Sequence, residues 1–285
     1  MSTVCNNRRP APLRLGAALA VTVISCVMAV VSSAETYPDT LDRITKTKEF
    51  HIGFVVLPPA VFKDANTNEP MGYYVDIARY IAEQMNVKPV FHEETWATFI
   101  SGLQAGRYDL SIAGTVNTIP RAMAVAFTEP LGYVGTCIIV AKSSAFQSLE
   151  DLAKPGIKIG VIQGAFMVPW AKQTFPNGQI LESSTSAVVE PMNVVTGRVD
   201  ASVTDSWICR KFASEHPEVR TLYSDEPLNI TATGWMVRRD DLLLLNFVNS
   251  AIRYVRSTGT LKKFFDKYDG RQLQEKKQWE IWGPR

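Results

Sequence analysis

Short apolar runs alternate with helical patterns along the chain, and this alternation limits the fold more than any other feature. The apolar runs predict strands at residues 51–56, 88–92, 110–113, 137–142, 158–161, 201–204, 220–223 and 232–237. Apolar residues spaced as on one face of a helix predict helices at 75–85, 96–105, 149–153, 167–174, 187–196, 207–215, 242–257 and 261–268. Strands that alternate with helices indicate an α/β fold.

A single arginine, Arg121, follows one of these strands. The helix predicted at 96–105 leads to the strand at 110–113, and a polar turn then leads to the arginine. Because ligands of open α/β sheets bind outside the carboxyl ends of strands, a guanidinium at this place is a candidate clamp for an anion. The alternative is a surface arginine that pairs with Glu129.

The first 34 residues have the three-part plan of a secretory signal. Arg8, Arg9 and Arg14 precede an apolar run at 15–31, and Ser32-Ser33-Ala34 follows it. This pattern predicts cleavage after Ala34 and a secreted protein.

Two other fates of this segment stay open. The apolar run of 17 residues is just short of a membrane span, so the segment could remain as an N-terminal anchor. Lipid attachment at Cys26, after Val23, Ile24 and Ser25, is a weaker alternative because apolar residues continue beyond the cysteine.

Removal of this segment changes the charge and the cysteine content. It takes away three of 30 basic residues and none of 28 acidic residues, which leaves a formal charge of −1. This balance gives no reason to expect binding to nucleic acid. Only Cys137 and Cys209 remain, and two free buried thiols are as consistent with the sequence as a disulfide.

Several sequence blocks, taken in order, carry a resemblance to a known family. They are GYYVDIA at 72–78, WATFISGL at 96–103, GRYDL at 106–110, TIPR at 118–121 with FTEP at 127–130, and GRVDASVTD at 197–205. With them the chain resembles the bacterial extracellular solute-binding proteins of family 3, the periplasmic amino-acid-binding components of ABC transporters.

The resemblance implies a two-lobed periplasmic-binding-protein-like II fold, also called a Venus flytrap, with two hinge strands. We expect the long apolar runs around Cys137 and Ala232 to be those hinges. The predicted boundaries are a signal peptide at 1–34, lobe 1 at 35–135 with 232–270, lobe 2 at 136–231, and a tail at 271–285.

The resemblance also assigns roles to residues of a cleft between the lobes. Arg121 would hold the carboxylate of a ligand and Asp205 its ammonium group, although Asp205 could equally be the N-cap of the following helix. Trp96 would line the pocket, or else pack in the core. Gly114 would offer its carbonyl, and Gly164 would begin an anion-binding turn at a helix N-terminus.

Five positions depart from the pattern of the family. Val116 stands where a hydroxyl residue is usual, with Thr115 displaced by one place, and Ala165 and Phe166 follow the second-lobe glycine in place of threonine or serine. Leu57 replaces a frequent aromatic residue. We therefore expect a more apolar pocket and doubt a strongly polar amino acid as the ligand.

The function expected from the resemblance is that of a periplasmic, monomeric receptor for an amino acid or related small carboxylate. It would deliver this ligand to an ABC transporter permease in the inner membrane, without a cofactor or a bound metal. One alternative is a cyclohexadienyl or arogenate dehydratase on the same fold, but Val168 stands where those enzymes carry a glutamate. Another is a ligand-sensing input module.

No other catalytic constellation is present in the sequence. His51, His92 and His216 are scattered, and His92-Glu93 lacks the second histidine of a zinc-binding helix. We therefore expect a binding protein and not an enzyme.

Overall fold

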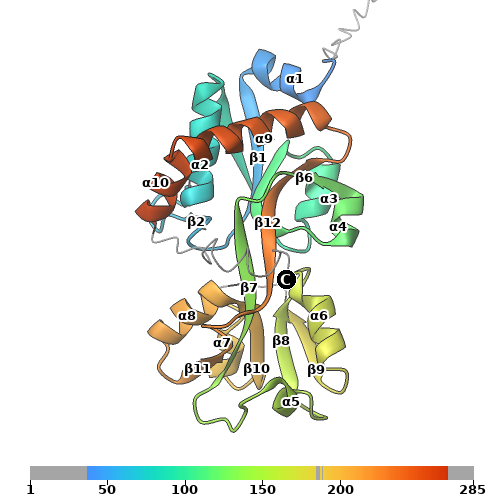
Figure 1. The fold of residues 1–285 in the computed structure, drawn as a ribbon, viewed down its shortest axis with the longest axis vertical. Coiled ribbons are helices and arrows are strands. Elements are labelled where there is room, and N and C mark those ends of the chain that lie inside the picture. The colour runs from blue at the N-terminus through green and yellow to red at the C-terminus, as the bar shows by residue number, and fades with distance from the viewer. Residues whose placement is uncertain (1–36, 184–186, 188, 269–285) are drawn as a thin grey trace, which may run out of the picture. The chain divides into compact units, whose positions relative to one another are not determined.

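The computed structural model describes residues 37–183, 187 and 189–268 (Figure 1). The predicted leader at 1–34, with its alternative fates, and the predicted tail at 271–285 lie outside the described residues. Within the described ranges no helix is both long and apolar enough to cross a membrane.

The first part of the described chain alternates short helices and strands. Its elements are α1 (Thr40–Thr47), β1 (Glu49–Val55), β2 (Phe62–Lys63), β3 (Pro70–Met71), α2 (Tyr73–Gln84), β4 (Lys88–Glu94), α3 (Phe99–Gln104), β5 (Leu110–Val116), α4 (Ile119–Ala124) and β6 (Val125–Phe127). The second part begins with a long strand and continues with β7 (Gly132–Ala141), α5 (Leu149–Leu152), β8 (Lys158–Ile162), α6 (Met167–Thr174), β9 (Gln179–Ser183), α7 (Met192–Val195), β10 (Ala201–Asp205), α8 (Ser206–Glu215) and β11 (Val219–Leu222). A second long strand, β12 (Leu228–Arg238), leads back to α9 (Leu242–Ser257) and α10 (Thr260–Lys267).

Ten strands form one mixed sheet. Eight of them lie in the order β4-β1-β5-β12-β7-β10-β8-β9, and the other two, β6 and β11, pair with β12 and β7. At one end β1 is parallel to β4 and β5, and at the other end β8 is parallel to β9 and β10. The two long strands β7 and β12 are antiparallel to each other and join the two parallel parts (Figure 1). The predicted α/β class is therefore confirmed.

Each parallel part of the sheet has its own hydrophobic core. One core surrounds the fully buried Phe50, Ile77 and Trp235, with α2, α9 and α10 packed over the strands. The other core surrounds Val161 and Phe175. We call the parts around these cores lobe 1 and lobe 2. The predicted lobe boundaries, 135/136 and 231/232, fall inside β7 and β12 and stay a prediction.

The structure differs from the predicted elements at several places. The helix predicted at 187–196 is reduced to α7, because Pro191 disfavours helical backbone at the residue before it and occupies the N-cap. The helix predicted at 96–105 begins only at Phe99, and Trp96 lies in the turn before it. Helices α1 and α4 and strands β2, β3, β6 and β9 were not predicted, because they are short or lie at an edge with little periodic burial.

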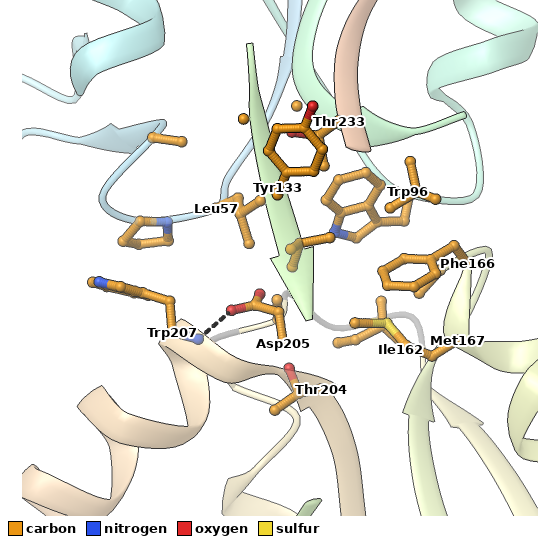
Figure 2. A pocket seen from close by; sticks show the side chains of 18 of the residues that line it. Leu57, Trp96, Tyr133, Ile162, Phe166, Met167, Thr204, Asp205, Trp207 and Thr233 are labelled. Atoms are coloured by element: carbon orange, nitrogen blue, oxygen red, sulfur yellow. Dashed lines mark hydrogen bonds between the residues drawn. The ribbon is translucent and has the colours of Figure 1, made fainter. Parts of the chain in front are cut away.

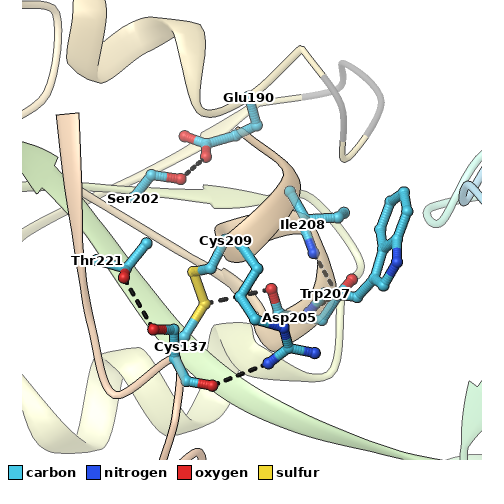
Figure 3. The surroundings of a disulfide bond; sticks show 10 residues. Cys137, Glu190, Ser202, Asp205, Trp207, Ile208, Cys209 and Thr221 are labelled. Carbon is cyan, nitrogen blue, oxygen red and sulfur yellow. Dashed lines mark hydrogen bonds between the residues drawn. A yellow bond between two sulfur atoms is a disulfide. The ribbon is translucent and has the colours of Figure 1, made fainter. Parts of the chain in front are cut away.

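A disulfide joins Cys137 of β7 to Cys209 of α8, with 6.5 Å between the two Cα atoms (Figure 3). Both residues are fully buried in lobe 2. The sulfur of Cys137 lies 3.2 Å from the carbonyl oxygen of Asp205. Of the two states left open by the sequence, the structure therefore has the disulfide, and it fixes the first turns of α8 to a hinge strand.

Candidate functional site

A pocket lies between the lobes, beside the long strands β7 and β12 (Figure 2). Its volume of about 120 Å³ exceeds the ~10–15 Å³ that one water molecule needs roughly tenfold, so it can hold a small metabolite. The lining comes from both lobes and comprises Leu57, Pro58, Pro59, Ala60, Tyr73, Tyr74, Trp96, Gly114, Val116, Arg121, Gly132, Tyr133, Val134, Ile162, Ala165, Phe166, Met167, Ala187, Val203, Thr204, Asp205, Trp207 and Thr233.

Arg121 reaches the pocket from α4, a helix of six residues in lobe 1. The hydroxyl of Thr118 accepts a hydrogen bond from the backbone N–H of Arg121 at 3.4 Å and so caps the helix, and Pro120 suits its first turn. The side chain packs its guanidinium over the ring of Phe99, 5.3 Å from the ring centre. A short capped helix thus positions the cation at the end of β5.

The guanidinium of Arg121 bonds to backbone carbonyls and not to acids. It donates to the carbonyl of Val116 at 3.2 Å and to that of Gly164, in lobe 2, at 2.8 Å. No carboxylate among the described residues forms an ion pair with Arg121. The alternative prediction, a surface arginine paired with Glu129, is wrong because Glu129 pairs with Arg253. Arg121 is 9% exposed, and burial alone lowers its pKa to about 10, so it remains charged at neutral pH.

Asp205 supplies the opposite charge from lobe 2. It ends β10 and is the N-cap of α8, where its Oδ1 accepts hydrogen bonds from the N–H groups of Trp207 at 3.0 Å and Ile208 at 2.9 Å. Burial raises the pKa of the Asp205 carboxyl to about 6, although the two N–H groups and Arg210 favour its charged form. The carboxyl group points into the pocket in Figure 2, so the predicted cap and the lining position belong to one side chain.

The remaining predicted residues lie at or beside the pocket. Trp96, Gly114, Val116, Ala165 and Phe166 line it. Trp96 also packs against Phe99 with ring centres 5.5 Å apart, so the predicted core packing and the lining position occur together.

Thr115 is the predicted residue whose side chain does not line the pocket. Successive residues of a strand face opposite sides, and Gly114 and Val116 on either side of it in β5 face the pocket. Within the described residues the Thr115 hydroxyl is buried without a hydrogen-bond partner.

Gly164 also lies outside the lining, but it contacts two residues of lobe 1. Its carbonyl accepts the bond from Arg121, and its backbone has a φ of +77°. A Cβ atom here would lie 2.5 Å from the carbonyl oxygen of Trp96. Only glycine therefore permits this close approach of the two lobes.

Sequence reasoning missed several lining residues, among them Tyr73, Tyr133, Met167 and Trp207. Burial raises the pKa of the Tyr73 phenol well above its ordinary value, with further contributions from Tyr74 and from the charge of Asp205. Trp207 could have been predicted, because it lies two places after Asp205, the expected N-cap and ligand contact, and so belongs to the first turn of the same helix.

The three histidines were expected to lie apart, and this expectation is wrong for His51 and His92. The parallel strands β1 and β4 bring Nδ1 of His51 within 2.9 Å of Nε2 of His92, away from the pocket lining. Among the described residues no cluster of three His, Cys, Asp or Glu side chains could hold a metal ion.

Comparison with known proteins gives a consistent result. The model of the family described as "Bacterial extracellular solute-binding proteins, family 3" matches residues 51–271. The ABC transporter arginine-binding protein 1 of Escherichia coli K12 is 27% identical over 216 residues, which cover 74% of this chain and 86% of that protein. The glutamine-binding protein GlnH of Bacillus subtilis is 27% identical over 83% of this chain and 87% of its own length.

Solved structures agree with these matches. The crystal structure of the ancestral amino acid-binding protein AncCDT-1, a precursor of cyclohexadienyl dehydratase, has a TM-score of 0.74 and 31% identity, over 81% of this chain and 99% of that one. An ancestral arginine-binding protein bound to glutamine has a TM-score of 0.71 and 29% identity, over 79% of this chain and 99% of its own length. The chain therefore belongs to the bacterial extracellular solute-binding proteins of family 3.

Proposed function

We propose that this protein is an extracytoplasmic receptor that binds an amino acid or a closely related small carboxylate and delivers it to an ABC importer. One observation carries the proposal: a buried, charged guanidinium, Arg121, lines a pocket without an acidic partner among the described residues. Burying a charge without a counter-charge is unfavourable, so a ligand that brings a carboxylate supplies what the pocket lacks.

The guanidinium has the geometry to hold a carboxylate. It carries five N–H donors, and Val116 and Gly164 accept two hydrogen bonds from it. The donors that remain can bind carboxylate oxygens through charge-assisted hydrogen bonds, which are stronger than neutral ones. Arg121 is therefore our proposed anchor for the ligand carboxylate.

Asp205 is our proposed partner for the ligand ammonium group. Arg121 belongs to lobe 1 and Asp205 to lobe 2, so a zwitterion that reaches both contacts the two lobes at once. Such a ligand binds the closed arrangement better than an open one and shifts the population toward it. Binding and closure would then be one event.

We also propose the setting in which this event is used. The protein would work as a monomer in the periplasm after loss of its leader, and the closed form would dock on the permease of the importer in the inner membrane. The names of the relatives support an importer and a periplasmic location, since they include an ABC transporter arginine-binding protein and a histidine-binding periplasmic protein.

Binding without catalysis is favoured over a dehydratase. A dehydratase needs an acid that can protonate a leaving hydroxyl group. Val168, at the position expected for that acid, packs against the core of lobe 2 and does not line the pocket. Asp205 is the only carboxylate among the described lining residues; burial raises its pKa to about 6, yet at neutral pH it is mostly ionised and accepts two backbone N–H bonds. Incubation with prephenate or arogenate should therefore yield no aromatic product.

Calorimetric titration of the mature protein with individual amino acids tests the proposal. We expect at least one to bind, and Arg121→Ala to weaken that binding by about 100-fold or more, because a charge-assisted contact is lost and the pocket charge is unbalanced. Arg253→Ala is the matched control, since Arg253 is an exposed arginine paired with Glu129. Equal affinities for the wild type and Arg121→Ala would refute the proposal.

A further inference from the structure

The pocket also indicates the kind of amino acid that it accepts, an inference that rests on the proposed function. We infer that the ligand is a zwitterion with an uncharged, apolar side chain, either aromatic or branched aliphatic.

The lining contains one positive and one negative residue among those that the structure describes, Arg121 and Asp205. The carboxylate and the ammonium group that all α-amino acids share would use both. A side chain with its own charge would then be enclosed without a partner, and an unpaired buried charge is strongly unfavourable. Lysine, arginine, aspartate and glutamate are therefore disfavoured by the charge count.

Lobe 1 presents an apolar surface to the pocket. It is formed by Leu57, Pro58, Pro59, Trp96 and Val116. Leu57 is held in place by a two-way backbone pairing with Val61, at N–O distances of 2.7 and 3.0 Å. In Figure 2 the side chains of Leu57 and Trp96 point to the space above Asp205.

Lobe 2 presents a matching apolar surface. Ile162, at the end of β8, and Phe166 and Met167, at the start of α6, face the pocket from one side of Asp205, and Trp207 lies on the other side (Figure 2). Flat rings and branched aliphatic groups on both lobes favour a ligand side chain that gains by leaving water. A large apolar side chain fills such a space better than a small polar one.

The polar groups of the lining do not change this conclusion. Apart from Arg121 and Asp205, the polar side chains of the described lining are uncharged: they are the hydroxyls of Thr204 and Thr233, the phenols of Tyr73, Tyr74 and Tyr133, and the indoles of Trp96 and Trp207. A neutral hydroxyl cannot balance the charge of a guanidinium or a second carboxylate. Aromatic faces do attract cations, but a cation–π contact is worth less than the hydration that an enclosed ammonium group loses.

Two of the named relatives provide a contrast. They are an arginine-binding and a histidine-binding protein of Escherichia coli K12, which are 27% and 26% identical to this chain. Membership of the family thus leaves the side chain of the ligand undetermined, and the lining of this pocket favours a different choice.

Calorimetric titration with a matched set of amino acids tests the inference. The set contains leucine, isoleucine, phenylalanine and tryptophan against arginine, lysine, aspartate and glutamate. We expect the tightest apolar ligand to bind at least 100-fold more tightly than any charged one. A charged amino acid that binds as tightly would overturn this inference while leaving the proposed function intact. Failure of every amino acid, by contrast, would overturn the proposed function itself.

A change of one lining residue separates charge from shape. Leu57→Asp adds a second carboxylate to the pocket, and Leu57→Asn is its uncharged counterpart of nearly equal size. The ratio of arginine affinity to leucine affinity should rise at least tenfold in Leu57→Asp relative to Leu57→Asn. Thermal unfolding of both variants verifies that they fold. Equal ratios in two folded variants would contradict the charge argument.

Discussion

The two charges of the pocket are held in different ways. Asp205 in lobe 2 is fixed by N–H groups two and three residues further along its own helix, and the disulfide at Cys209 ties that helix to β7. Arg121 in lobe 1 lies at the end of a long side chain, and one of its two carbonyl partners, Gly164, belongs to the other lobe. The negative charge is thus positioned by one lobe, whereas the positive charge depends in part on closure.

This difference assigns a separate task to each side. In lobe 2 the carboxylate is oriented by N–H groups of the helix that it caps, and its burial in the pocket appears as a raised pKa. Lobe 1 carries a cation whose bond to Gly164 exists only when the lobes are together. Changes at Asp205 should therefore alter which ligands bind, and changes at Gly164 should alter closure for every ligand.

After the loss expected for Arg121→Ala, the largest effect on this comparison is expected from Asp205→Asn. Asparagine is as good an N-cap as aspartate, so α8 should persist, but the charge that faces the ammonium group is lost. We expect amino acids to bind about 30-fold more weakly, or ~2 kcal/mol, and carboxylic acids without an ammonium group to change little. Calorimetry with such a pair of ligands measures the difference. Equal losses for both ligands would remove the role given to Asp205.

A smaller, ligand-independent effect is expected from Gly164→Ala. The added Cβ would meet the Trp96 carbonyl oxygen at 2.5 Å and would strain a backbone with a φ of +77°. We expect affinity to fall about tenfold for all ligands, because the lobes can no longer meet without a shift.

The matched control for that variant is Gly197→Ala. Gly197 lies in lobe 2 with a φ of +68°, and nothing lies within 4 Å of the position of a Cβ atom there. This control carries similar backbone strain without a contact between the lobes. If both variants weaken binding equally, closure through Gly164 is not the cause.

The smallest expected effect is the dependence of affinity on pH. The free Asp205 carboxyl has a raised pKa of about 6, and a bound ammonium group would lower it, so binding requires the ionised form. Affinity should fall about fourfold between pH 7.5 and 5.5, as the ionised fraction falls. Asp205→Asn should lack this dependence.

Stability of the ligand-free protein should change with pH in the opposite direction. The pKa of Asp205 is higher in the folded state than its ordinary value of 3.8, so protonation favours folding. This contribution is present below pH 4 and is lost as pH rises through about 6. Chemical unfolding of the wild type and of Asp205→Asn at both ends of this range measures it, and a contribution of the reverse sign would contradict the burial of this carboxyl.

Elements with a clear apolar pattern could be predicted from the sequence, whereas several elements without one could not. The predicted helices at 167–174 and 242–257 coincide with α6 and α9, because each has an apolar face that packs on a core. The sequence of helix α4, which carries Arg121, predicts only a polar turn, since six residues with two exposed apolar side chains, Ile119 and Met123, show no such face.

The candidate site was predictable where the chemistry of a residue is unusual for its place. Arg121 follows β5 and is visible in the sequence as a cation beyond the end of a strand, whereas Asp205, the last residue of β10, was indicated by the resemblance to the family. Tyr73 and Met167 were missed because apolar and aromatic residues at the start of a helix look the same whether they face a core or a pocket. Their role depends on how two lobes meet, which no local pattern encodes.

The most direct test of Arg121 as the carboxylate anchor uses two truncated ligands. One is the tightest amino acid without its ammonium group, and the other is the same amino acid without its carboxylate. Calorimetry should show that Arg121→Ala weakens the amino acid and the carboxylic acid by about the same large factor and leaves the amine unchanged. An equal loss for the amine, or no loss for the carboxylic acid, would contradict the account.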